Sequence, residues 1–305
     1  MQVPRVRNRV NVAIVCSVQA IAIALLWLGA RLSGWPLLGV GVVFSMLLLT
    51  NYALIHEATH DNLNSDPRWN RRLGALAGFL FPIPFSMIKV THTVHHCCNR
   101  TDHEMFDLYY PGDNMVLKLG QWYGLLCGFF WPWIPVGMVI LALFPALLRT
   151  APFRNARTTA VLFDDFEAHG LWRIRAEMAA MLIYWIALFQ WLELQWPQLL
   201  LMYACFAFNW STRQYVTHAF TPRDVVNGAL NLQVSRPMAW LLLYGNWDLV
   251  HHQRPWLPWT ELAAAGRTSA PPVSFWRQYL RMWAGPVPAA EPSPQRLAAT
   301  PDPQY

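Results

Sequence analysis

Eight of the ten histidines in the chain fall at spacings that suit metal binding. Residues four apart lie on one face of an α-helix, so a pair such as His56 and His60 can present two imidazoles to one site. Neutral imidazole is a good ligand for iron, zinc and copper. The pattern therefore predicts a metal site assembled from several helices. Its candidate ligands are His56, His60, His92, His95, His96, His218, His251 and His252.

The other two histidines, His103 and His169, stand apart from these groups. A lone histidine is more simply a hydrogen-bonded core or interfacial residue, and we interpret both in that way. The grouped histidines are different, because ionisable residues at the ends of membrane segments are costly and are usually functional. Metal binding is the better interpretation for the groups.

The run from His56 to His60 also fits HExxH, the pattern of zinc metalloproteases. In such a site two histidines bind zinc and the glutamate, here Glu57, acts as general base. An intramembrane zinc protease is therefore the alternative from another class. It needs one further protein ligand and an open position, and it leaves the remaining histidine groups without a role.

Three motifs together resemble the membrane fatty acid desaturase and hydroxylase superfamily: HxxxH at 56–60, HxxHH at 92–96 and a late HH at 251–252. The resemblance implies a cytoplasm-facing, non-haem centre of two irons that activates dioxygen. It also implies electrons from a separate ferredoxin, rubredoxin or cytochrome b5 type of carrier with its reductase. His218 resembles an additional ligand histidine that stearoyl-type desaturases carry before their last box.

The last box departs from that pattern, because Asp248 stands where the superfamily usually has a histidine. A carboxylate also ligates iron, so Asp248 is a candidate ligand or a partner that orients a ligand imidazole. Glu57 and Asp61 are candidates for the same two roles. Asp102 and Glu104 lie near the boxes and are weaker candidates for hydrogen bonding to an imidazole.

The elements that must position these residues are membrane helices. Of the 305 residues, 55% are hydrophobic and 13% are charged, against roughly 25% charged in soluble domains. Several apolar segments reach the length of about 20 residues that crosses a bilayer. We expect an all-α integral membrane protein with four to six transmembrane helices. The net charge of +6 is read as the positive-inside bias of such proteins and not as nucleic-acid binding.

Segments 10–28 and 37–55 form the predicted first hairpin, and Pro82 and Pro84 make segment 73–90 dip into the membrane surface. Segment 121–148 is either one long helix or a hairpin broken at 131–135, and segment 178–209 can break similarly around 193–197. Keeping the intervening arginines cytoplasmic favours an even number of crossings in each. These are Arg149, Arg154, Arg157, Arg173 and Arg175. Residues 1–285 form the expected enzyme domain, and 286–305 a disordered tail.

The expected reaction is dioxygen-dependent desaturation or hydroxylation of a fatty acyl or other lipid-like chain reached from the bilayer. Arg68, Arg71 and Arg72 are candidates to bind its head group. The run from His251 to Trp259 also resembles carotenoid ketolases and hydroxylases, and alkane-type oxygenation belongs to the same superfamily. The chain shows no haem or ferredoxin-like cysteine motif, so we expect a partner protein to supply the electrons.

Overall fold

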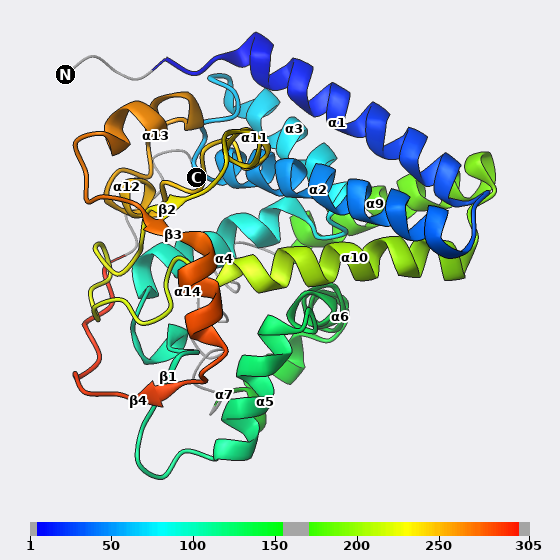
Figure 1. The fold of residues 1–305 in the computed structure, drawn as a ribbon. Coiled ribbons are helices and arrows are strands. Elements are labelled where there is room, and N and C mark those ends of the chain that lie inside the picture. Colours follow the sequence, from blue (N-terminus) through cyan, green and yellow to red (C-terminus); the bar gives the residue numbers. More distant parts are fainter. Residues whose placement is uncertain (1–4, 155–170, 299–305) are drawn as a thin grey trace.

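The computed structural model describes residues 5–154 and 171–298, which fold mostly into helices (Figure 1). His169 and Arg157 lie outside the described residues. Helix α1 (Asn8–Gly29) packs along α2 (Gly34–Thr59), and α2 also packs against α10 (Trp196–Gln214). Helix α2 is thus the centre of the apolar core, with α3 (Pro67–Leu80) and α4 (Phe85–Cys98) against another side.

Two helices, α1 and α2, are long and apolar enough to cross a membrane, as the first predicted hairpin requires. Two bent pairs raise the number to four if each pair is one span: α3 with α4, bent by 97°, and α5 (Met115–Leu126) with α6 (Phe130–Leu143), bent by 105°. Within the described residues the fold is therefore helical with two to four candidate spans. Helix α9 (Leu171–Leu192) does not add a span by this criterion, and its first turns carry Arg173, Arg175 and Glu177.

The predicted break around 193–197 is confirmed, because α9 ends at Leu192 and α10 begins at Trp196. Pro82 and Pro84 lie in the bend between α3 and α4. The break predicted at 131–135 is misplaced, because α5 and α6 part at residues 127–129. Gly128 has a φ of +90°, and a Cβ there would lie 2.6 Å from the Phe208 Cα. The expected break included Pro132 and Pro135. Pro132 lies in the first turn of α6, where no backbone hydrogen bond is lost, and Pro135 lies inside α6 without ending it.

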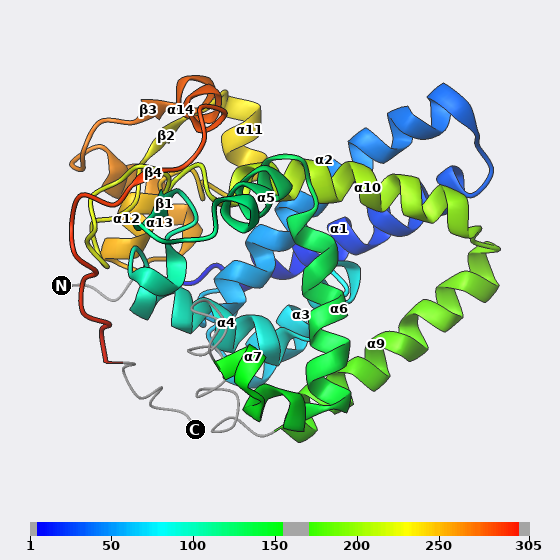
Figure 2. The same ribbon diagram turned by 90° about the horizontal axis from the view of Figure 1, so that it is seen from below.

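The short elements gather at one end of the long helices, and the turn between α9 and α10 lies at the opposite end (Figure 2). They include α11 (Arg236–Leu241), α12 (Asp248–Gln253), α13 (Trp259–Gly266) and α14 (Phe275–Met282). In the described sequence between α4 and α9 there are also the short helices η1 (Asp102–Glu104), η2 (Pro145–Arg149) and α7 (Ala151–Arg154).

Two short parallel strand pairs tie this end together. Strand β1 (Leu108–Tyr109) pairs with β4 (Val287–Pro288), and β2 (Leu232–Gln233) pairs with β3 (Val273–Ser274). Strand β4 belongs to the segment expected to be a disordered tail. In its described part, residues 286–298, that segment is held by the strand pairing and by a hydrogen bond from the Leu297 amide to the Cys97 carbonyl.

Candidate metal centre

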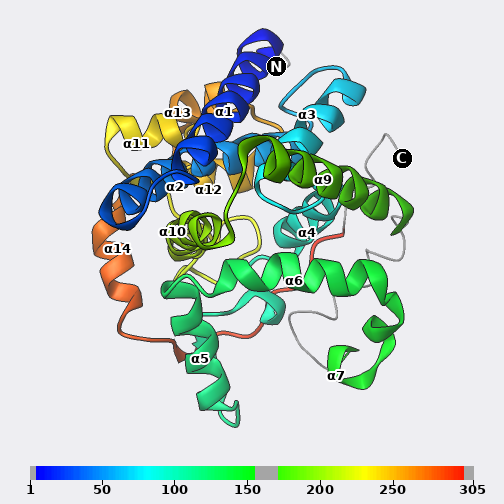
Figure 3. The ribbon, with the colours of Figure 1, turned by 90° about the vertical axis from the view of Figure 1, so that its right-hand side faces the viewer.

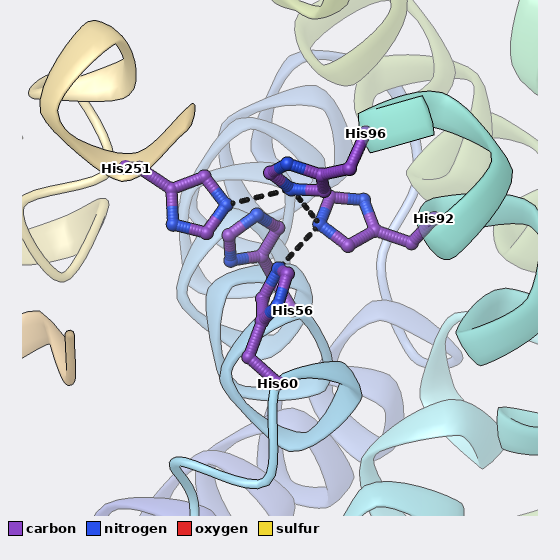
Figure 4. Close-up of side chains that lie close together, drawn as sticks. All are labelled: His56, His60, His92, His96 and His251. Atoms are coloured by element: carbon purple, nitrogen blue, oxygen red, sulfur yellow. Dashed lines mark hydrogen bonds between the residues drawn. The ribbon is translucent and has the colours of Figure 1, made fainter. Parts of the chain in front are cut away.

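The first histidine group contains residues from three helices, α2, α4 and α12. His56 and His60 come from the end of α2, His92 and His96 from α4, and His251 from α12 (Figure 4). One ring nitrogen from each of the five lies within 4.8 Å of the corresponding atom of every other. The predicted i and i+4 spacing is confirmed for α2 and α4, each of which supplies two imidazoles from one face.

The distances between these nitrogens fit a shared metal ion. The Nε2 atom of His96 lies 3.1 Å from that of His92 and 3.0 Å from that of His251, and His60 and His92 are 2.8 Å apart. A ring nitrogen offers one proton or one lone pair, so it cannot hydrogen-bond well to both neighbours. Two nitrogens that bind one ion at about 2.1 Å and at right angles would be roughly 3.0 Å apart.

A second group lies beside the first and contains His95, His218 and His252, with ring nitrogens within 4.8 Å of one another. The Asp248 Oδ2 atom lies 3.2 Å from the His218 Nε2 atom and 4.0 Å from the His252 Nε2 atom. Although it is this close, Oδ2 makes no hydrogen bond with the described residues. The carboxylate and the imidazoles therefore converge on common space, as ligands of one ion would.

Two of these imidazoles are oriented by hydrogen bonds on their far side. The Glu104 carboxylate accepts a hydrogen bond from His95 Nδ1 at 2.5 Å, and the Gly228 carbonyl accepts one from His218 Nδ1 at 3.1 Å. Such bonds fix the tautomer and aim the Nε2 lone pair. Glu104 was a weak candidate from the sequence, whereas Gly228 was missed because nothing in its neighbourhood predicts which carbonyl faces His218.

Burial determines the protonation state of several histidines of the two groups. It lowers the pKa of His218 to about 3 and holds the pKa of His251 and of His252 well below the usual range. These imidazoles are therefore neutral in the fold, which is the form that binds metal. Burial also raises the pKa of Asp248. A positive ion at the site would favour the ionised carboxylate.

The structure does not bring Glu57 or Asp61 into either group. The buried Glu57 carboxylate accepts a hydrogen bond from the Trp259 amide at 2.9 Å. Asp61 pairs with Lys89 at 3.0 Å. Asp102 likewise pairs with Arg223. His56 and His60 lie with three further imidazoles, and the Glu57 carboxylate is bonded to a backbone amide, so the zinc protease alternative loses its basis.

A cavity of about 1310 Å³ leads to both histidine groups. His56 and His92 line it beside His95 and His218, and most other lining residues are apolar, from α2, α5, α6 and α10. His103, which was set aside from the ligands, also lines this cavity. The candidate head-group residues do not: Arg68, Arg71 and Arg72 are exposed on α3 and lie outside the lining.

Comparison with known proteins gives one match that covers most of the chain. Residues 33–290 match the sequence model of the family described as fatty acid desaturase. The matched region contains all eight grouped histidines and Asp248. No curated protein matches the chain.

Proposed function

The chain belongs to the fatty acid desaturase family of membrane non-haem di-iron oxidoreductases, and on this premise we propose that it desaturates a long apolar chain of a lipid taken from the bilayer. The observation that carries the proposal is that two adjoining groups of imidazoles form one wall of a large apolar cavity. A protein that only stored or carried metal would have no need for such a cavity.

We propose the eight histidines and Asp248 as the ligands of two irons. One iron would be held by His56, His60, His92, His96 and His251, and the other by His95, His218, His252 and Asp248. When bound, the pair supplies the reduction of dioxygen and an oxidant strong enough to take hydrogen from an unactivated C–H bond.

The chain itself contributes position and a dry environment. Glu104 and Gly228 hold two imidazoles in their binding orientation. The neutral rings of His218 and His252 accept an ion without first losing a proton. The apolar walls from α5 and α6 exclude water from the substrate chain and confine it to a path past the histidines.

The proposal also covers the side of the membrane that the metal site faces, the electron donor and the extent of the enzyme unit. We place the metal site on the cytoplasmic side, because Arg149, Arg154, Arg173 and Arg175 lie between the α5–α6 and α9–α10 segments and favour that side. The electrons would come from a separate ferredoxin, rubredoxin or cytochrome b5 type of carrier. We propose residues 1–285 as one enzyme unit, and the pairing of β4 with β1 supports extending it to the following residues.

Metal content and product analysis test the proposal. Protein purified with native lipids should contain about two irons per chain, and a host that expresses it should accumulate a lipid with an added double bond. Stoichiometric zinc without iron would overturn the metal assignment. An added hydroxyl or keto group would keep the irons but replace desaturation by alkane-type or carotenoid-type oxygenation.

A further inference from the structure

One arginine in the cavity lacks the acidic partner that the chain provides for its other buried arginines. Arg100 is buried and pairs with Asp107 at 2.7 Å, and the buried Arg223 pairs with Asp102 at 2.6 Å. Arg213 is half-buried and lines the cavity. Throughout residues 5–154 and 171–298, no carboxylate pairs with it. A charge withdrawn from water without a counter-charge is costly unless a ligand supplies one.

The surroundings of Arg213 hold it in place without neutralising it. Its Nε donates to the Asn209 Oδ1 atom at 2.9 Å, and Asn209 in turn donates to the Ser45 hydroxyl at 3.1 Å. The guanidinium carbon lies 4.8 Å from the centre of the Phe275 ring. The Nε–H is thereby used, and the group is fixed against an aromatic face with its remaining N–H donors available.

The three acids that line the cavity do not pair with Arg213, because each lies beside another group. Glu57 is bonded to the Trp259 amide, Glu104 to His95, and Asp248 lies against His218. Among the described residues that line the cavity, Arg213 is the one lysine or arginine. It comes from the last turn of α10, which packs between α2, α5 and α6 (Figure 3). The cavity thus combines long apolar walls with one cationic group.

We infer that Arg213 determines substrate specificity by binding a terminal carboxylate, so that the cavity takes a free long-chain acid in preference to a neutral lipid. The planar guanidinium matches a carboxylate and provides charge-assisted hydrogen bonds. Arg213 takes the role expected from the sequence for Arg68, Arg71 and Arg72. The inference rests on the proposed function, because it names the substrate class of the same cavity.

Binding measured without turnover tests this inference. Protein in lipid nanodiscs is titrated with a radiolabelled saturated fatty acid and with its methyl ester, each corrected for binding to empty nanodiscs. The wild type should bind the acid at least tenfold more tightly than the ester, and Arg213→Gln should abolish that difference. Arg281→Gln is the matched control, since Arg281 stacks on Phe220 at 4.6 Å but is exposed and outside the cavity lining.

Arg213→Lys keeps the inference testable if the glutamine variant does not fold. Lysine retains the positive charge but lacks the planar set of N–H donors of the guanidinium. The variant should therefore keep a reduced preference for the acid, with unchanged ester binding. Equal binding of acid and ester by the wild type overturns the inference, as does an equal effect of the Arg213 and Arg281 variants. Failure of the proposed function would instead appear as missing iron or missing oxidation of every lipid, independently of these binding data.

Discussion

Replacing Asp248 by asparagine should remove one of the two irons and leave the other. The two groups are unequal, since one offers five imidazoles and the other offers three with the Asp248 carboxylate. Asparagine has nearly the same shape but no negative charge. The smaller group would then lose its only anionic donor, whereas the larger group would be unchanged.

The expected magnitude follows from the position of this carboxylate. Removing a group that merely orients a metal ligand commonly lowers metal affinity by about 10–100-fold. Asp248 is 3.2 Å from the His218 Nε2 atom, on the metal-facing side of that ring. We therefore expect the second iron to bind at least about 10–100-fold more weakly, or roughly 1.4–2.8 kcal/mol.

The assay is iron content after titration of the purified protein with a chelator. Wild-type protein should release its irons at high chelator concentration, and Asp248→Asn should hold one iron where the wild type holds two. Asp61→Asn is the control, because the Asp61 carboxylate pairs with Lys89 and accepts a hydrogen bond from Asn70 but belongs to neither histidine group. Asp248→His should retain more iron than Asp248→Asn. Equal iron and equal release midpoints for Asp248→Asn and wild type would refute the assignment.

Three further outcomes can be measured. Glu104→Gln should lower iron affinity by about 10–100-fold through His95, while unchanged chelator release would remove Glu104 from the site. Gly137→Leu should shift products toward shorter chains, because Gly137 lines the cavity with open space at its Cβ; an unchanged chain-length profile in the product lipids would show that the substrate lies elsewhere. Metal-free protein should lose thermal stability from pH 7 to pH 5. Burial lowers the pKa of His218 to about 3, so below roughly pH 6.5 the unfolded chain binds more protons than the folded one. A midpoint of unfolding independent of pH would contradict that reasoning.

The clustering of the eight histidines was predictable because its signal is local. Spacing within one helix, as in His56 and His60, already determines that two imidazoles share a face. The position of Asp248 beside the second group was predictable for the same reason, since it lies one helical turn before His252. The spacing does not predict which group each histidine joins. His95 and His96 are adjacent in the chain yet belong to different groups.

The features that were missed depend on contacts between distant segments. In the sequence, Arg213 is indistinguishable from an ordinary basic residue at a helix end. Only the packing of α10 against its neighbours places it in the cavity. The break before α6 follows Gly128, whose close approach to Phe208 is a tertiary contact, while the more conspicuous Pro132 fits within the helix start. Strand β4 has two residues and no sequence pattern of its own, so its pairing with β1 could not be predicted.

The order in which the helices are synthesised constrains when the metal centre can form. Helix α2 brings the first two imidazoles early in translation, whereas His251 and His252 arrive only with α12, after α10 and the loops that follow it. Both histidine groups include a residue of α12. Neither group is complete until that short helix has been made and has docked against α2 and α4. The complete ligand set proposed for either iron is thus available only late in synthesis, after the segments that contain α2, α4 and α10.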